Sequence, residues 1–282
     1  MKQLALILTI LVAAASCTQL ATDAPKRQGW RDGPLYGNVE SVTVTSYFLK
    51  ESSGVLSRSK IKGKICYNFN ESGDVTERVQ YNSDGSLDDK YTYKYDTKGN
   101  LTEVAEYKSD GTIRNKYIYK YDTKGNQTEE AYYKSDGSLD YKCIYKYDTQ
   151  GTEESLYTSD GLLSRKCIYK YDTQGNELET SSYTSAGSLI SKCIYKYDSK
   201  GNLTEWARYN SDGSLDYKWI YKYDRKGNNT EEALYASDGS LSSKEIYKYK
   251  YDSKGNIAEA TKYYGKMQKP ISQDVYTIIF RK

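Results

Sequence analysis

Histidine is absent from this chain of 282 residues, and its absence removes several kinds of active site. Without His, neither a Ser-His-Asp nor a Cys-His nucleophile arrangement can be built, and the commonest side-chain ligand for metals is missing. The sequence also has no Gly-rich phosphate-binding loop and no Cys-x-x-Cys motif. We therefore expect no enzymatic activity, and we predict no catalytic residue, no metal site and no cofactor.

Apolar residues are scarce as well, at 37% of the chain with a mean hydropathy of −0.84. Such a composition alone is compatible with disorder. The 33 tyrosines argue for a fold, because each ring buries apolar area while its hydroxyl keeps a polar contact. Basic and acidic residues are interleaved at a net charge of +3, so the clustered positive charge of a nucleic-acid-binding surface is missing. We predict no nucleic-acid partner.

A unit of about 26 residues fills most of the chain and is represented by LDYKWIYKYDRKGNNTEEALY at 215–235. The Tyr-Asp near its middle recurs, and a degenerate first copy lies at Asn70. From that copy to Asp252 the spacings are 26, 26, 26, 24, 26, 26 and 28. A fixed period of this size indicates a repeat architecture.

Every irregular spacing differs from the others by an even number, which favours β-strands. Side chains alternate between the two faces of a strand, so only an even change keeps all later residues on their original face. Tyr, Ile, Thr and Trp, which are common in strands, crowd the same runs. The sequence predicts an all-β fold, an antiparallel β-meander of two strands per unit. We expect about 17 strands in a twisted, curling, elongated sheet with its tyrosine face inward.

Two Gly-containing turns per unit set a predicted register. Both fit a three-residue hairpin loop, which places Asp224 opposite Asn228 and Asn210 opposite Ser214. Extended along the strands, this register places Arg208 opposite Asp216. It also collects the odd-numbered residues from Tyr67 to Tyr263 on one aromatic face.

The aromatic face contains all but one of the candidate ligand-binding residues. One Glu per unit is expected there, either accepting hydrogen bonds from tyrosine hydroxyls or lining a polar, aromatic groove for a ligand. Trp206 is expected on the opposite, polar face, as an exposed platform or as an isolated surface aromatic. The candidate ligand-binding residues are Trp206, Trp219, Tyr217, Tyr221, Glu205 and Glu231.

The N-terminus has the features of an export signal: Lys2, an apolar run over 4–15 and small residues before Cys17. The Ala-Ala-Ser-Cys ending resembles the bacterial lipobox, and an ordinary secretory signal is the alternative. The resemblance implies cleavage before Cys17, lipidation of its thiol and attachment to a membrane of the bacterial envelope by acyl chains. It leaves open the outer membrane, the periplasmic side and the cell surface.

The remaining boundaries follow from composition and from the repeat. We predict a signal peptide over 1–16, a lipidated Cys and tether over 17–34, and N-terminal cap strands over 35–66. The repeats fill 67–264, and 265–282 forms a C-terminal cap. Four cysteines lie within the caps and repeats. Cys143, Cys167 and Cys193 occupy equivalent positions about 9–10 Å apart, too far for a disulfide, whereas Cys66 lies on the other face. We expect all four to be unpaired and the three equivalent ones to be buried.

The unit also supports a family resemblance. Tyr-x-Tyr-Asp-x-x-Gly-Asn-Leu-Thr-Glu, at 93–103 and 195–205, resembles the YD repeat of RHS-type proteins. The resemblance implies a coiling β-meander of a kind associated with sugar binding, in the small exported form common in gut Bacteroidetes. The stretch from Tyr209 also resembles Gram-positive cell-wall-binding repeats, but their Gly-Trp pairs are missing.

Two functions remain open. The first is a non-enzymatic envelope lipoprotein that binds glycan or another envelope polymer through exposed aromatic residues. The second is a structural or protein-interaction scaffold without a small ligand, whose partner would be an envelope protein. A row of accessible aromatics would favour the first, and packed tyrosines under an exposed face of Lys, Glu and Thr would favour the second. Both predicted faces carry charge in every unit, unlike the lipid-facing wall of a transmembrane barrel.

Overall fold

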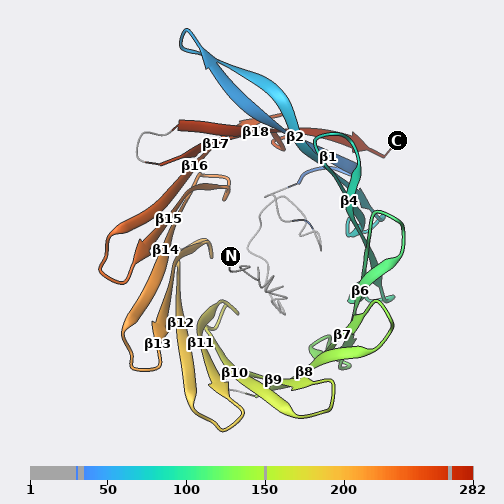
Figure 1. Cartoon of the computed structure of the whole chain (residues 1–282), viewed down its shortest axis with the longest axis vertical. Coiled ribbons are helices and arrows are strands. Elements are labelled where there is room, and N and C mark those ends of the chain that lie inside the picture. Colours follow the sequence, from blue (N-terminus) through green and yellow to red (C-terminus); the bar gives the residue numbers. More distant parts are fainter. Residues whose placement is uncertain (1–29, 31–34, 149–150, 266–268, 282) are drawn as a thin grey trace.

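The strands of this protein form one closed antiparallel sheet. The computed structural model describes residue 30 and residues 35–148, 151–265 and 269–281, and the predicted signal peptide and Cys17 lie outside this part. Over the described residues eighteen strands follow one another in chain order around a ring (Figure 1). The predicted all-β meander is confirmed.

The strands have the following bounds: β1 (Val39–Ser52), β2 (Val55–Phe69), β3 (Val75–Tyr81), β4 (Leu87–Tyr95), β5 (Leu101–Tyr107), β6 (Ile113–Tyr121), β7 (Gln127–Lys134), β8 (Leu139–Tyr147), β9 (Thr152–Thr158), β10 (Leu163–Tyr171), β11 (Glu177–Thr184), β12 (Leu189–Tyr197), β13 (Leu203–Asn210), β14 (Leu215–Tyr223), β15 (Asn229–Ala236), β16 (Leu241–Tyr251), β17 (Ile257–Tyr264) and β18 (Lys269–Phe280).

The predicted hairpin loops are present at both turns of the unit. The N–H of Asp224 donates to the carbonyl of Asn228 at 2.9 Å, and that of Asn210 donates to Ser214 at 2.9 Å. Gly227 adopts φ 84°, a left-handed conformation that glycine reaches without steric cost. The Asp224 carboxylate accepts the N–H of Asn228 at 2.9 Å and so fixes the loop.

A β-bulge follows every turn of the repeats except the one at 148–151, and the predicted register beyond the turns is wrong for this reason. Tyr223 lies opposite Asn229, but the next pair is Lys222 with Glu231, so one residue of β15 is left over. The same happens on β14, where Arg208 lies opposite Tyr217 and not opposite Asp216. A shift of one residue moves every later side chain to the other face of its strand.

A threonine of the repeat stabilises this bulge. The hydroxyl of Thr204, the extra residue after the turn, donates to the carbonyl of Lys196 on the preceding strand at 3.1 Å. Thr102 makes the same bond to Lys94 at 3.2 Å. The Thr of the Asn-Leu-Thr-Glu motif therefore satisfies a carbonyl group where the regular ladder is interrupted.

The first and last strands, which come from the two segments predicted as caps, pair with each other. Val42 of β1 lies opposite Ile278 of β18 on one side and opposite Tyr67 of β2 on the other, which closes the barrel. An apolar cluster lies at this seam, and Trp30 packs against it. Its buried members are Leu35, Val39, Val42, Val44, Phe69 and Val75.

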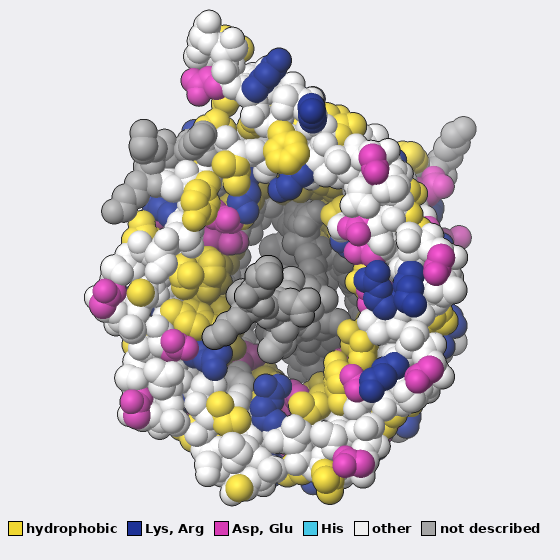
Figure 2. All heavy atoms as spheres, viewed as in Figure 1, with side chains coloured by type: hydrophobic (Ala, Val, Ile, Leu, Met, Phe, Trp, Pro, Cys, Tyr) yellow, Lys and Arg dark blue, Asp and Glu magenta, His cyan; other side chains and the backbone are white. Residues whose placement is uncertain are grey.

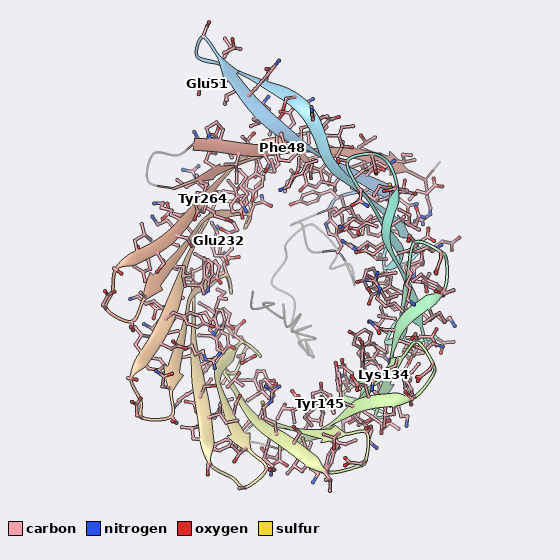
Figure 3. The ribbon with its side chains drawn as sticks, in the orientation of Figure 1. Phe48, Glu51, Lys134, Tyr145, Glu232 and Tyr264 are labelled. Atoms are coloured by element: carbon pink, nitrogen blue, oxygen red, sulfur yellow. The ribbon has the colours of Figure 1, made fainter. Side chains whose placement is uncertain are left out.

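The closed sheet surrounds a central hollow, which Figure 2 shows from one end. We call the face of the sheet that carries Tyr145 and Glu232 the inner wall, because both side chains extend from β8 and β15 toward the interior (Figure 3). The opposite face is the outer wall. No helix among the described residues is long and apolar enough to cross a membrane.

Candidate functional site

Four of the predicted ligand-binding residues come together on the inner wall. Trp206 of β13 lies directly opposite Trp219 of β14, and Tyr217 lies opposite Arg208. Tyr221, two residues beyond Trp219 on the same strand, shares this face because side chains alternate along a strand. The expectation that Trp206 lies on the polar face is wrong, because the bulge after the turn at 210–214 reverses the faces of β13 relative to β14.

Ring contacts connect these side chains across three strands. Tyr195 and Trp206 are stacked, with ring centroids 6.5 Å apart and planes at 12°, and Trp206 meets Tyr217 edge-on at 5.7 Å. Trp219 and Tyr221 stack at 6.3 Å along β14. We call Tyr195, Trp206, Tyr217, Trp219 and Tyr221 the aromatic arc. None of the five is buried, so their rings retain accessible surface on the inner wall.

Glu205 and Glu231 lie on the outer wall, so their predicted place beside the tyrosines is wrong. The bulge turns them toward the lysines: Lys196 Nζ lies 2.8 Å from Glu205, and Lys222 and Lys244 lie 3.0 and 2.9 Å from the two oxygens of Glu231. Burial opposes ionisation of Glu231, but hydrogen bonds from Lys244 and Lys222 prevail and lower its pKa. The same Lys-Glu-Lys cluster recurs around the barrel at Glu103, Glu129 and Glu179.

Other carboxylates occupy the inner wall, and sequence reasoning missed them. The signal was a pair of adjacent glutamates in several units, because alternation sends one outward and its neighbour inward. In the pair Glu231-Glu232 the second residue lies opposite Tyr221. The inner-wall carboxylates are Asp89, Glu106, Glu130, Glu154, Glu177, Glu232, Glu245 and Asp274.

Tyrosine hydroxyls donate to these inner carboxylates, as expected for glutamates on an aromatic face, although different glutamates are involved. The hydroxyl of Tyr145 donates to Glu130 at 3.3 Å, and that of Tyr169 donates to Glu154 at 2.5 Å. Burial, and then the negative charge of Glu154, raise the pKa of Glu130. Burial also raises the pKa of Glu177, which is only 5% exposed.

Three buried hydrogen-bond donors on the inner wall lack a hydrogen bond of ordinary geometry, and one of them, the Nε of Arg208, lies 3.5 Å from a carboxylate oxygen of Asp216. Among the described residues, none accepts a hydrogen bond from the Tyr119 hydroxyl, although this side chain is only 3% exposed. The buried N–H of Trp206 also has no hydrogen bond of ordinary geometry. It lies beside the thiol of Cys193, whose sulfur is a weak acceptor and whose pKa is raised mainly by burial. Unsatisfied polar groups are infrequent in folded proteins. These atoms are enclosed by protein, so a ligand in the hollow would not reach them directly.

The cysteines offer no cross-link. Cys66, Cys143, Cys167 and Cys193 are all free thiols in the described part of the chain, as predicted. Cys143 and Cys167 are buried, whereas Cys193 is only partly buried, so the prediction of burial is wrong for that residue. Across the described ranges, no group of three or more Cys, Asp or Glu could hold a metal ion.

No protein-family model and no curated protein matches this sequence. Among solved structures, the chain is similar to a porin-like protein from Bacteroides uniformis, at 11% identity and a TM-score of 0.43 over 88% of this chain and 100% of that one. A porin-like protein from Bacteroides vulgatus gives 11% identity and a TM-score of 0.36, over 86% and 99% of the two chains.

The chain is also similar to TcdB2-TccC3, at 13% identity and a TM-score of 0.33 over 79% of this chain. It spans only 15% of that protein's length. Identities this low and TM-scores below 0.5 transfer no function to this chain.

Proposed function

We propose that this protein is a non-enzymatic lipoprotein of the bacterial cell envelope, anchored through Cys17, whose barrel interior binds a glycan or another envelope polymer. The anchor rests on the lipobox-like end of the N-terminal apolar segment. The binding function rests on one observation of the fold: the aromatic arc and the inner carboxylates share the wall that surrounds the hollow.

This wall has the chemistry that a sugar chain requires. A pyranose ring presents an apolar C–H face, which packs on aromatic rings, and a rim of hydroxyls, which need acceptors and donors. Trp206 and Trp219 supply the flat apolar surface, and Glu232, opposite Tyr221, supplies an acceptor. Binding sites commonly combine such an aromatic lining with a few polar groups.

The scaffold remains the second candidate, because the outer wall has the composition expected for it. Repeated Lys-Glu pairs cover that wall, as at Lys120 with Glu129 and at Lys170 with Glu179. A protein that only meets other proteins through this wall would leave the aromatic arc without a ligand. Substitutions on the two walls therefore separate the two candidates.

The test is a glycan and peptidoglycan array probed with the chain from Thr18 onward, which keeps every described residue. We expect selective binding that Trp206→Ala reduces at least tenfold. Tyr209→Ala is the matched control, because Tyr209 lies on the same strand but on the outer wall, opposite Leu215. Its binding is expected to equal that of the parent.

The tryptophans provide an independent readout that does not rely on truncating a ring. Titration with a binding glycan is expected to change the emission of Trp206 and Trp219, whose indoles are on the inner wall. A folded protein that binds no polymer on the array, or that binds equally well after Trp206→Ala, would disprove binding at the aromatic arc. Pull-downs from the envelope would then test the scaffold.

A further inference from the structure

One part of the sheet takes no part in the barrel wall. β1 pairs with β18 only as far as Phe48, and β2 begins to pair with β3 only at Lys64. Between these points the two strands pair with each other alone, up to Ser52 with Val55. We call residues 49–62 the projecting ribbon, which extends outward from the ring in Figure 1.

The ribbon exposes three apolar side chains. Val55, next to the turn at Ser53 and Gly54, is 67% exposed, and the neighbouring Leu56 and Ile61 are exposed as well. A two-stranded hairpin is marginally stable in water without a surface to pack on. An exposed aliphatic tip on such a hairpin indicates contact with an apolar phase or a partner.

The ribbon also has a net positive charge that equals that of the whole chain. Residues 49–62 contain Lys50, Arg58, Lys60 and Lys62 against Glu51, a balance of four minus one, or +3, which equals the net charge of the whole sequence. Arg58 is neutralised by Glu259 at 2.6 Å. Lys50, Lys60 and Lys62 are exposed and form no ion pair with a described residue, in contrast to the paired lysines of the outer wall.

We propose that the projecting ribbon is a membrane-binding element for anionic lipid. Val55 and Leu56 enter the headgroup region, and Lys50, Lys60 and Lys62 bind the lipid phosphates. Exposed apolar residues beside unpaired lysines match the two components of peripheral membrane binding, burial of apolar area and attraction to anionic headgroups. This element is separate from the predicted acyl anchor at Cys17 and independent of any ligand in the barrel.

Two other occupants fit the ribbon less well. A soluble polyanion would neutralise the lysines but would leave the aliphatic tip in water. A second copy of the chain would offer carboxylates at the Ser-Asp-Gly turns, such as Asp84 and Asp212, but each is already hydrogen-bonded within its own turn, to Ser86 and to Ser214.

The test uses the chain from Thr18 onward, which lacks the acylated cysteine, in flotation with vesicles. We expect binding to mixed phosphatidylethanolamine and phosphatidylglycerol and none to phosphatidylcholine alone. Val55→Asp with Leu56→Asp is expected to weaken binding at least tenfold. Leu162→Asp is the matched control, because Leu162 is 66% exposed at another hairpin, and it should bind as the parent does.

A second pair of variants tests the charges. Lys60→Gln with Lys62→Gln is expected to weaken binding about 30-fold, since each lysine at an anionic surface contributes roughly fivefold. Lys98→Gln with Lys146→Gln, at exposed positions away from the ribbon, should change nothing. Because the ribbon lies outside the barrel wall, all variants should keep the parent's melting temperature.

Three results would overturn the proposal: equal binding to both kinds of vesicle, no binding to either, or binding that the ribbon variants leave unchanged. Light scattering on the same samples tests the second copy. A concentration-dependent dimer that the ribbon variants abolish, without vesicle binding by the parent, would assign the ribbon to self-association. Loss of vesicle binding leaves the glycan array unaffected, so the two proposals fail separately.

Discussion

Trp206 of β13 faces Trp219 of β14 across one step of the sheet, and both indoles belong to the inner wall. Glu205, the residue before Trp206, points to the outer wall and pairs with Lys196. Neighbouring positions on one strand therefore belong to different environments, one aromatic and one ionic. This separation defines the candidate site, and substitutions test it directly.

We expect Trp206→Ala to lower the free energy of unfolding by about 2–3 kcal/mol, below the loss for a fully buried Trp. Glu205→Ala should lower it by less than about 1 kcal/mol, because its partner Lys196 is largely exposed and surface ion pairs contribute little. Urea unfolding of both variants measures the difference. If Glu205→Ala proved the more damaging, the register with its bulges would be wrong.

Glu231→Gln should destabilise the protein at neutral pH and not at low pH. Lys244 and Lys222 hold the pKa of Glu231 below its ordinary value of 4.5 even though partial burial opposes ionisation. A carboxylate with a lowered pKa stabilises the fold above that value, and the contribution is lost as the pH falls. We expect a loss of about 1 kcal/mol at neutral pH, reduced by salt. If the parent were still more stable than Glu231→Gln at acidic pH, the ion-pair explanation would be ruled out.

Glu177→Gln should have the opposite dependence on pH. Burial raises the pKa of Glu177, so the folded protein holds this proton more tightly than the unfolded chain does. A raised pKa favours the fold at low pH, and the advantage is lost as the pH rises. The variant should therefore melt at a higher temperature than the parent under mildly alkaline conditions, and the two should converge in acid. Melting curves of both proteins across a pH series measure this difference. A parent that remained more stable than the variant in alkali would contradict the explanation.

Gly151→Ala should be far more damaging than Gly213→Ala. Gly151 lies in the hairpin that is two residues shorter than its neighbours, and a Cβ there would lie 1.9 Å from the carbonyl oxygen of Tyr169. We expect a loss of about 3 kcal/mol, at the upper end for overpacking. At Gly213 a Cβ meets nothing within 4 Å, so only the left-handed φ of 84° opposes alanine. The left-handed conformation of an alanine lowers the free energy of unfolding by about 1–2 kcal/mol. Similar losses at both glycines would contradict the close approach of the two backbones.

The strands and both turns could be predicted from sequence because they depend on local chemistry. The predicted tyrosine face is correct only in part: Tyr217 and Tyr221 lie on the inner wall, but Tyr209, predicted on the same face, lies on the outer wall. The Asp and Gly residues that close the loop at 224–228 occupy fixed positions in the unit, and even spacings reveal alternation. The bulges could not be predicted in this way. Most units contain two, so the bulges add an even number of residues and leave the spacing unchanged. The unit with the short turn at 148–151 lacks one bulge and one loop residue, which is again an even change.

The error in the candidate site follows from the bulges. The predicted register was shifted by one residue, so it placed Glu205 and Glu231 on the face of the tyrosines and Trp206 on the face of the lysines. The structure has the reverse arrangement. The threonine that bonds across the bulge, such as Thr204, is part of the sequence motif. Threonine is also common in regular strands, so its presence does not reveal a bulge. Closure of the sheet into a barrel could not be predicted from the sequence either, because it depends on pairing between distant segments, such as Val42 with Ile278.

The seam between β1 and β18 imposes an order on biosynthesis. Residues on its two sides are more than 200 positions apart in the chain, as Val44 and Tyr276 are, so the barrel cannot close until its last strand has been made. Contacts over such separations form slowly, since the entropy of a long loop must be lost first. Until then β1 and β17 each have an open edge, on which other chains can pair. A chain of this design must therefore avoid pairing with other chains until β18 has been synthesised.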